Sequence, residues 1–395
     1  MRWVSAVSTM SPLEAAVRDV TTAIARELDG TTPDLAVAFV SEQHQGEYER
    51  LPALLRGQLA PRLLIGCSAG GVIGGGREVE RQAGLSITAA VLPGVDLTPF
   101  HLEGEVLPDR TAPAAGWETL VGITSSRRPA FLLLPDPFTF DAESLVAGLD
   151  AAFSESPKIG GLASGGREPG ANALYLGDTV YRSGAIGVAL GGNVEVDTIV
   201  AQGCRPIGEP MFVTRADQHV LYGLDGQPAL AVLQELLANA DARDRQLFAN
   251  ALFLGVVMKK QQQQQEYRQG DFVIRNLLGI DGKSGAIAVG AALHTGMVVQ
   301  FHLRDAETSA QDLEAVLARY QEGSQRRPAG ALLFSCLGRG VHLYGSPNHD
   351  TDAFRRHLGP VPLGGFFCNG EIGPVHGSTF LHGYTSSFGL FRSRA

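Results

Sequence analysis

Two charged side chains in the C-terminal third of the sequence have the chemistry to hold a small ligand. Arg339 lies between two glycines, directly after the apolar run at 331–336. Its planar guanidinium presents five N–H donors, which suit the two oxygens of a carboxylate. Glu371 follows another glycine-rich strand end and can accept an ammonium group from a ligand. The same two residues can instead form a structural ion pair with each other, and the sequence leaves both possibilities open.

Five further polar residues are candidates for the site, and all but Thr385 lie at or just after the ends of predicted strands, where glycine-rich turns expose backbone N–H groups to a ligand. They are Ser68, Ser164, Arg304, Asn369 and Thr385. The hydroxyl of Thr385 can face a ligand or solvent, and Asp305, beside Arg304, can cap the next helix. Together with Arg339 and Glu371, these five residues form the predicted ligand-binding site.

A nucleophilic role for Ser68 is an alternative, because residues 66–70 match the G-x-S-x-G motif of hydrolases. That motif requires a helix after the nucleophile, and the glycines at 74–76 make a poor helix start. The interpretation as a glycine-rich turn is therefore favoured. A hydrolase or transferase that uses Ser68, Cys67 or Cys368 would need a general base within about 3 Å of the nucleophile.

Several segments look like cofactor-binding or metal-binding motifs, but they lack the residue spacing that those motifs require. Residues 279–284 end in Gly-Lys-Ser, as a phosphate-binding loop does, but Leu277 stands where that motif requires glycine. The same segment precedes an apolar strand, whereas a phosphate-binding loop precedes a helix. The glycines at 71–76 lack the G-x-G-x-x-G spacing of a dinucleotide site, and the ten histidines include no H-x-x-x-H or H-E-x-x-H pair. We therefore predict no cofactor and no metal site.

One succession of elements occurs three times in the sequence: strand, helix, strand, glycine-rich turn and strand. The paired strands before each turn are predicted at 35–40 and 63–66, at 131–134 and 159–161, and at 331–336 and 363–367. Their apolar residues do not alternate with polar ones, which is typical of sheet interiors covered on both faces. The sequence therefore predicts an α/β fold with mixed sheets covered by helices. Because the three turns occupy equivalent strand ends, we expect them to gather in space.

The chain is predicted to contain an N-terminal extension and two similar halves. An apolar stripe from Leu13 to Leu28 at helical spacing predicts a helix in the extension, which covers residues 1–32. Turn residues at 225–228 mark the boundary between a first domain, 33–224, and a second domain, 225–395. The glutamine run at 261–265 is interpreted as a surface loop or a helix extension.

Composition argues against several classes of function. The net charge of −9 and the lack of a long basic cluster argue against nucleic-acid binding. No apolar run approaches the roughly 20 residues that a membrane-spanning helix needs. The N-terminus lacks the apolar segment of a secretory leader, and the four cysteines form no C-x-x-C pair. We therefore predict a soluble, cytoplasmic protein.

Several of these segments resemble the FIST family, which is named for F-box and intracellular signal transduction proteins. The N-terminal resemblance rests on Ile-Gly-Cys-Ser-Ala-Gly-Gly at 65–71 and on Ile-Gly-Gly at 159–161. The C-terminal resemblance is more specific and rests on the segments at 301–305, 336–340, 364–374 and 381–385. This resemblance implies FIST N-like and FIST C-like domains and a sensory module for small ligands, with amino acids as candidates. It supplies no catalytic residues.

The leading hypothesis is a sensory protein that binds a small molecule through the residues named above. An α-amino acid would suit a site in which Arg339 faces its carboxylate and Glu371 faces its ammonium group. No kinase, cyclase, chemotaxis or F-box segment is recognised in the sequence, so we expect the signal to pass through a separate protein partner. Besides the hydrolase, the remaining alternative is an interaction scaffold that binds a partner protein without a ligand.

Overall fold

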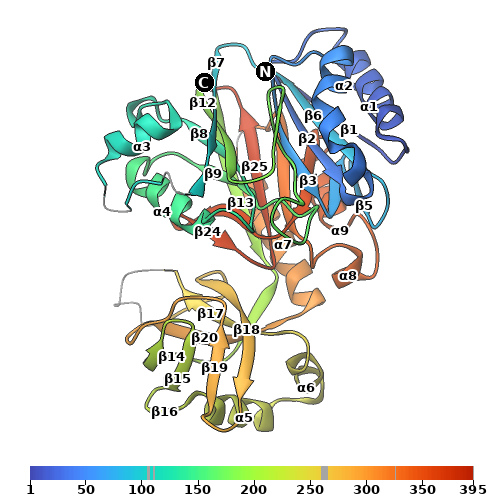
Figure 1. Ribbon diagram of the computed structural model, residues 1–395. Helices are drawn as coiled ribbons and strands as arrows, with labels where there is room; N and C mark the ends of the chain where they lie inside the picture. The colour runs from blue at the N-terminus through green and yellow to red at the C-terminus, as the bar shows by residue number, and fades with distance from the viewer. Residues whose placement is uncertain (105–106, 110–111, 259–265, 325, 395) are drawn as a thin grey trace. The chain divides into compact units, whose positions relative to one another are not determined.

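The computed structural model describes residues 1–104, 107–109, 112–258, 266–324 and 326–394 (Figure 1). It confirms the prediction of an α/β fold with several mixed sheets covered by helices. The chain forms two compact units, and each is discontinuous in the sequence. Unit 1 contains Met1–Val200, Glu314–Leu381 and Thr385–Ala395, and unit 2 contains Ala201–Leu313 and His382–Tyr384. These compact units are not the two predicted domains, whose boundary between residues 224 and 225 stays a prediction.

Unit 1 is built from three repeats that share one order of strands and main helices, although the first residues of α7 and the last residues of β13 and β24 belong to unit 2. Repeat 1 comprises β1 (Arg2–Ser8), α1 (Leu13–Glu27), β2 (Leu35–Ser41), η1 (Glu42–Arg50), α2 (Leu51–Gln58), β3 (Leu63–Ala69), β4 (Gly71–Gly74), β5 (Arg77–Glu80) and β6 (Leu85–Val91). Repeat 2 comprises β7 (Val95–Leu102), α3 (Ala114–Val121), η3 (Ser125–Arg127), β8 (Ala130–Pro135), α4 (Ala142–Ala152), β9 (Lys158–Gly161), β10 (Leu174–Leu176), β11 (Thr179–Tyr181) and β12 (Ala185–Gly192). Repeat 3 comprises β13 (Glu195–Gln202), α7 (Ala306–Gly323), β21 (Gly330–Cys336), α8 (Val341–Tyr344), α9 (His349–Leu358), β22 (Leu363–Cys368), β23 (Glu371–Val375), β24 (Ser378–His382) and β25 (Thr385–Arg392). Most of unit 2 comes between β13 and α7 in the sequence.

The three repeats exchange hairpins to complete three six-stranded sheets. The first sheet has the order β1-β6-β2-β3-β10-β11, so it receives the β10–β11 hairpin of repeat 2. The second sheet, β7-β12-β8-β9-β23-β24, receives the β23–β24 hairpin of repeat 3. The third sheet, β13-β25-β21-β22-β4-β5, receives the β4–β5 hairpin of repeat 1. The exchange is therefore cyclic, and each sheet depends on a second repeat for two of its strands.

A parallel strand pair precedes the turn in each repeat and confirms the three predicted copies. The pairs are β2 with β3, β8 with β9, and β21 with β22. A glycine occupies the same place in the second strand of every pair, at Gly66, Gly160 and Gly365. A Cβ atom at any of the three would lie 1.8 or 1.9 Å from a carbonyl oxygen of the neighbouring parallel strand. Only glycine fits such a close backbone approach.

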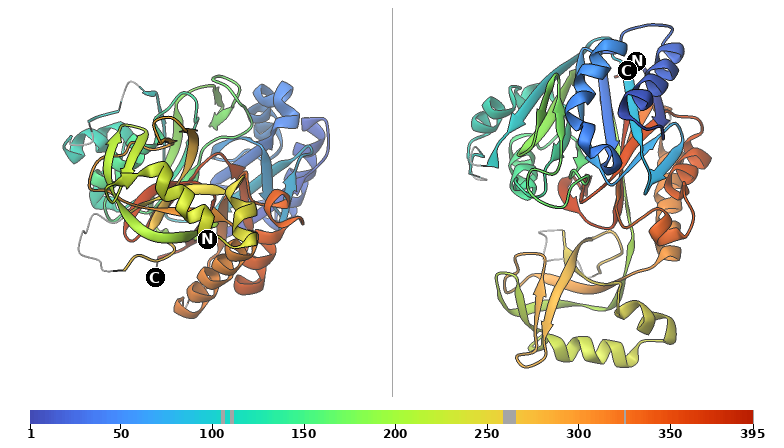
Figure 2. Two further views of the ribbon diagram at one scale, coloured as in Figure 1. Left: turned by 90° about the horizontal axis from the view of Figure 1, so that it is seen from below. Right: turned by 45° about the vertical axis from the view of Figure 1, so that its right-hand side comes forward.

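The inner faces of the three sheets pack into one apolar core, which includes Ile65, Leu132 and Phe366. The helices of unit 1 lie on the outer faces of the sheets (Figure 2). Helices α1 and α2 share an apolar cluster with the first sheet, and α3 and α4 share one with the second. Helix α9 contacts the third sheet through the stacked rings of Phe354 and Phe388. This layering explains why the central strands are apolar on both faces.

The N-terminal segment differs from the predicted helix extension. Helix α1 forms as expected, but Arg2–Ser8 is a strand, β1, which pairs antiparallel with β6 in the first sheet. The partner strand is distant in the sequence, so no local pattern could indicate this pairing. The glutamine run at 261–265 lies outside the described residues.

The described strands of unit 2 form a closed antiparallel ring. Its elements are β14 (Cys204–Asp217), β15 (Val220–Leu224), β16 (Gln227–Pro228), α5 (Ala229–Asn239), α6 (Ala242–Phe248), β17 (Leu252–Val257), β18 (Phe272–Asp281), β19 (Ala286–Val289) and β20 (Val298–Arg304). Strand β14 pairs with both β20 and β15, which closes the ring. One face of the strands packs with α5 around Leu233, Leu254 and Phe301. The segment at 279–284 spans the end of β18 and the turn before β19, as predicted.

Candidate functional site

The three glycine-rich turns meet in space, as the sequence predicts. The hydroxyl of Ser164, in the second turn, donates to the backbone oxygen of Phe367 at 2.5 Å. The hydroxyl oxygen of Ser164 also accepts from the backbone N–H of Gly70, in the first turn, at 2.9 Å. The backbone N–H of Ser164 donates to the carbonyl oxygen of Ser68 at 3.2 Å. The turns therefore bind one another, and Ser164 bridges all three repeats.

Ser68 is buried and its hydroxyl belongs to a polar chain. The hydroxyl donates to Oδ1 of Asn172 at 3.0 Å and accepts from the N–H of Ala173 at 3.0 Å. The amide of Asn172 donates in turn to Oδ1 of Asp136 at 2.8 Å. An amide oxygen cannot take up a proton at neutral pH, so this contact does not activate Ser68 as a nucleophile.

The two cysteines nearest the turns are fully buried. Burial raises the pKa of the Cys67 thiol well above its ordinary value, and the charge of Asp136 adds to the effect. Burial also raises the pKa of the Cys368 thiol, where the nearby Glu371 adds to it. The thiolate is the nucleophilic form of cysteine, so neither side chain is prepared for covalent chemistry at neutral pH.

Arg339 is fully buried and its guanidinium is already paired. Its Nε donates to Oδ2 of Asp350 at 2.9 Å, and its Nη2 donates to Oδ1 at 3.0 Å. Asp350, in α9, also accepts hydroxyl hydrogen bonds from Ser335 at 3.1 Å and Ser386 at 2.5 Å. Burial opposes the ionisation of Asp350, but Arg339 and these hydrogen bonds outweigh it and hold the pKa well below the usual range. The buried acid that pairs with Arg339 is thus Asp350 and not Glu371.

Glu371 and Thr385, two of the predicted site residues, lie together. The backbone N–H and the hydroxyl of Thr385 donate to Oε2 of Glu371 at 3.0 and 2.8 Å. The thiol of Cys368 lies 3.5 Å from Oε1. Burial raises the pKa of Glu371 to about 7, although the Thr385 hydrogen bonds and the charge of Arg339 act in the opposite direction. Asn369, which lies between β22 and β23, is exposed.

The raised pKa of Glu371 predicts a dependence of stability on pH. An unfolded glutamate titrates near 4.5 and folded Glu371 near 7, so the folded state holds its proton more tightly. The stability that this carboxyl contributes is present below about pH 4.5 and is lost as the pH rises through 7, by up to about 3 kcal/mol. Urea unfolding of Glu371→Gln should therefore vary less with pH than unfolding of the wild-type chain between pH 4.5 and 7.5. Equal slopes in the two proteins would contradict this assignment.

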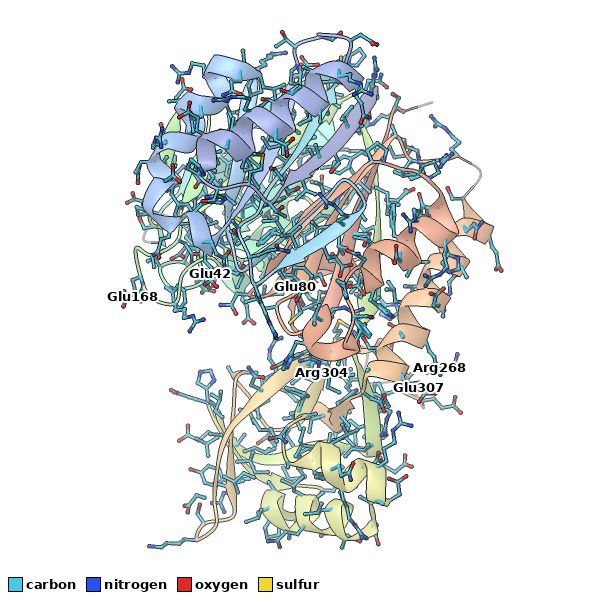
Figure 3. The ribbon with its side chains drawn as sticks, turned by 90° about the vertical axis from the view of Figure 1, so that its right-hand side faces the viewer. Glu42, Glu80, Glu168, Arg268, Arg304 and Glu307 are labelled. Carbon is cyan, nitrogen blue, oxygen red and sulfur yellow. The ribbon has the colours of Figure 1, made fainter. Side chains whose placement is uncertain are left out.

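Two acidic residues that sequence reasoning did not single out tie the exchanged β4–β5 hairpin to repeat 3. Oε1 of Glu78 accepts from the backbone N–H of Thr351 at 2.8 Å, and Oε1 of Glu80 accepts from that of Val341 at 3.0 Å. Glu80 is labelled in Figure 3. Burial raises the pKa of Glu78 to about 8, and the charge of Asp350 adds to the effect. The sequence of β5, Arg-Glu-Val-Glu, gives no local signal that Glu78 is buried.

Arg304, at the end of β20, differs from Arg339 in that no carboxylate within the described parts of the chain pairs with its guanidinium. Its guanidinium carbon lies 5.2 Å from the ring centroid of Tyr384 (Figure 3). Its Nε and Nη2 atoms are buried and have no hydrogen-bond partner among the described residues. The adjacent Asp305 makes other interactions. It caps α7, as predicted, and accepts a hydrogen bond from Arg243 at 2.7 Å. Arg304 belongs to unit 2, whereas the other six predicted site residues belong to unit 1.

The side chains around Arg304 occupy the face of the unit 2 strands opposite the cluster packed against α5. We call this surface the Arg304 face; it consists of Cys204, Phe253, Phe272, His302, Arg304 and Tyr384. The rings of Tyr384 and Phe253 lie 4.2 Å apart between centroids, and those of Phe272 and His302 lie 4.9 Å apart. The hydroxyl of Tyr384 donates to Oδ1 of Asn276, which fixes the ring in place. The Arg304 face therefore combines a cation without a carboxylate and ordered aromatic rings.

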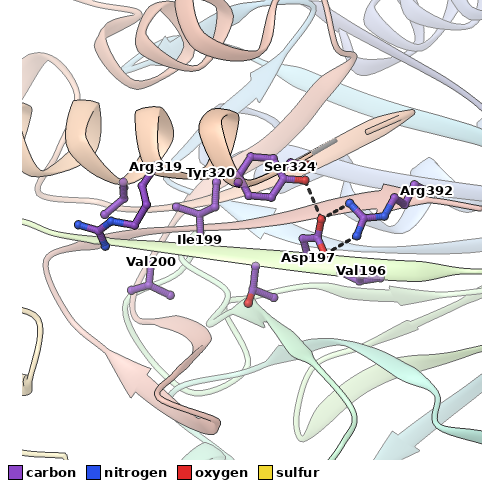
Figure 4. A pocket seen from close by; sticks show the side chains of 11 residues that line it. Val196, Asp197, Ile199, Val200, Arg319, Tyr320, Ser324 and Arg392 are labelled. Atoms are coloured by element: carbon purple, nitrogen blue, oxygen red, sulfur yellow. Dashed lines mark hydrogen bonds and ion pairs between the residues drawn. The ribbon is translucent and has the colours of Figure 1, made fainter. Parts of the chain in front are cut away.

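A groove of about 630 Å³ lies elsewhere, between β13 and α7 of unit 1 (Figure 4). Asp197 lines this groove and accepts hydrogen bonds from the hydroxyl of Tyr320 at 2.7 Å and from Nη2 of Arg392 at 3.0 Å. The lining of the groove includes none of the seven predicted site residues. Its polar groups are largely satisfied within the protein, so the groove is a weaker candidate than the Arg304 face.

Metal binding and membrane insertion are not indicated by the described residues. Among them, no group of three or more histidine, cysteine, aspartate or glutamate side chains is placed to hold a metal ion. Within the same parts of the chain, none of the helices combines the length and the apolarity that crossing a membrane requires.

Comparison with known proteins identifies relatives along nearly the whole chain. An uncharacterized protein of Mycobacterium tuberculosis is 37% identical over 387 residues, which cover 98% of each chain. An uncharacterized protein of Mycobacterium bovis is 36% identical over 367 residues, 92% of each chain. F-box only protein 22 of Homo sapiens is 33% identical over 102 residues, 25% of each chain. A solved cyanuric acid hydrolase from A. caulinodans aligns over 100% of this chain and 99% of its own at 10% identity, and its TM-score of 0.32 supports no inference.

Two models of known protein families also match the chain. Residues 34–227 match the FIST N domain, and residues 229–374 match the FIST C domain. The two matches adjoin and together span most of the sequence, which confirms the resemblance seen in the motifs. The chain belongs to the FIST family and carries both its N and its C domain.

Proposed function

We propose that this protein is a sensory protein that binds a small carboxylate, with α-amino acids as the leading candidates, on the Arg304 face. FIST domains are associated with sensory roles in signal transduction. The signal would pass to a separate protein partner. The observation that carries the proposal is the buried edge of the Arg304 guanidinium, which has two N–H donors and no acceptor.

The two unpartnered atoms of Arg304 favour a carboxylate in particular. Nε and Nη2 lie on one edge of the guanidinium, and this edge matches the two oxygens of a carboxylate in a bidentate pair. Arg339 uses the same two atoms for Asp350, so the chain itself provides an example of the geometry. A buried charge without a partner is costly, and an anionic ligand would remove that cost at Arg304.

The aromatic side chains around Arg304 would strengthen an ion pair between its guanidinium and a bound carboxylate. Tyr384 lies against the guanidinium and Phe253 lies against Tyr384. Aromatic rings exclude water from one side of the ion pair, and a charged hydrogen bond is stronger where water is excluded. Arg304 is itself only partly buried, so some of its side chain remains within reach of a ligand.

Replacing Arg304 by glutamine should weaken the binding of carboxylates about 10- to 100-fold, because charge-assisted hydrogen bonds contribute about 1.5–3 kcal/mol. The measurement is a thermal-shift screen of amino acids and other small carboxylates, followed by calorimetric titration of the compounds that stabilise the wild-type chain. A ligand at 100 times its Kd should stabilise the protein by about 2.7 kcal/mol.

Arg268→Gln is the matched control for this experiment. Arg268 also belongs to unit 2, but its side chain is 82% exposed (Figure 3). This variant should bind carboxylates as tightly as the wild type does. If no carboxylate stabilises the wild-type chain, or if Arg304→Gln binds with unchanged affinity, the proposed function is wrong.

A further inference from the structure

We propose that His302 and Gln202 determine the specificity of the Arg304 face by accepting a hydrogen bond from the ligand. The ligand would then be a carboxylic acid that carries an N–H or O–H donor, such as a 2-amino or 2-hydroxy acid, in preference to a 2-oxo acid. This inference rests on the proposed function, because it concerns the same ligand. Its support comes from two buried acceptor atoms that have no donor.

His302 provides the first acceptor. Its side chain is fully buried, and its Nδ1 lies 3.0 Å from the carbonyl oxygen of Gln300. Because a carbonyl oxygen can only accept, Nδ1 carries the proton and Nε2 holds a lone pair. Burial lowers the pKa of His302 to about 4, so the ring is neutral at pH 7. No donor reaches Nε2.

Gln202 provides the second acceptor. Its Nε2 donates to the backbone oxygen of Phe272 at 2.9 Å, which assigns the other amide atom as the oxygen. This Oε1 atom is buried and has no hydrogen-bond partner. The ring of Phe272 contacts His302 edge-on, so Phe272 is a common neighbour of both acceptors. Buried acceptors are rarely left unsatisfied in folded proteins.

The fold places the first acceptor, His302, on the same face of β20 as Arg304. His302 and Arg304 are two residues apart in β20, so their side chains project from the same face of the strand. His302 lies directly opposite Phe253 of β17, and Phe253 stacks on the Tyr384 ring that lies against Arg304. A ligand whose carboxylate pairs with Arg304 would therefore lie beside His302, and Gln202 contacts Phe272, the same residue that His302 contacts.

The test uses the full chain and triplets of compounds that differ only at carbon 2. Suitable triplets are alanine, lactate and pyruvate; glutamate, 2-hydroxyglutarate and 2-oxoglutarate; and phenylalanine, phenyllactate and phenylpyruvate. We expect the amino or hydroxy member of at least one triplet to bind the wild type about tenfold more tightly than the oxo member. In His302→Leu this preference should fall below about twofold, because the loss of affinity should be largest for the amino or hydroxy member.

Two further variants keep the inference open to refutation if His302→Leu does not fold. Gln202→Leu should also reduce the preference, and His302→Gln should retain it, because the amide oxygen of glutamine can replace Nε2. Equal binding of all members of a triplet would overturn this inference and leave the proposed function standing. A preference that persists in both leucine variants would do the same. Failure of every compound to bind would overturn the proposed function itself.

Discussion

Replacing Gly365 by alanine is expected to lower the free energy of unfolding by more than about 4 kcal/mol, a loss that few single substitutions cause. An alanine Cβ at this position would lie 1.9 Å from the carbonyl oxygen of Leu333 and 2.8 Å from its carbonyl carbon. The backbone at Gly365 also has a φ of +153°, which residues with a side chain rarely adopt. The colliding atoms belong to the backbone of β21, so no side-chain rotation can relieve the contact.

Gly57→Ala is the control for this substitution. Gly57 lies within α2, and no heavy atom comes within 4 Å of a Cβ placed there. Alanine in a helix is more favourable than glycine by about 0.5–1 kcal/mol, so this variant should be slightly more stable than the wild type. Urea unfolding of both variants measures the difference. A Gly365→Ala chain with a midpoint close to that of the wild type would show that β21 and β22 are not packed as described.

Replacing Asp350 by asparagine should destabilise the chain by about 3–5 kcal/mol, which is the usual effect of breaking a buried ion pair. The substitution leaves Arg339 fully buried without a carboxylate, and it weakens the hydrogen bonds from Ser335 and Ser386. A double substitution, Arg339→Met with Asp350→Leu, removes both charges and should recover much of the loss, because apolar side chains of similar volume tolerate burial.

Asp352→Asn tests whether the effect depends on burial. Asp352 lies on the same helix and pairs with Arg355, but this pair is accessible to solvent, with the two side chains 41% and 66% exposed. Exposed pairs of this kind contribute about 0.3–0.5 kcal/mol, so the variant should unfold near the wild-type midpoint. Similar losses for Asp350→Asn and Asp352→Asn would refute the view that the Arg339–Asp350 pair is a buried structural element.

The local part of the fold could be predicted from the sequence. The apolar runs indicated the parallel strand pairs, and the glycine-rich segments after them indicated the turns. Equivalent positions in three copies were enough to expect the turns to meet. The exchange of hairpins could not be predicted, because β4 pairs antiparallel with β22, far away in the sequence, and nothing in the residues of β4 identifies that partner. Strand β1 was missed for the same reason.

The candidate site was only partly predictable, because pairing in three dimensions decides which charged groups are available. Arg339 and Arg304 looked alike as arginines at strand ends. Asp350, in α9, pairs with the guanidinium of Arg339. The same helix contains the more exposed Asp352, and no local pattern in the sequence distinguishes the two aspartates. The ligand-binding role of the seven residues stays a prediction, and Arg304 is the member whose environment favours it most.

The cyclic exchange of hairpins has a consequence for synthesis on the ribosome. The β4–β5 hairpin leaves the ribosome early, but β22, the strand it must join, is translated about 290 residues later. At roughly 5–20 residues per second, the hairpin would wait about 15–60 s for its partner. During that time its unpaired edge is open to other nascent chains. The first repeat therefore cannot complete its strand pairings as an independent unit, and the hairpin remains open to wrong pairing until β22 emerges.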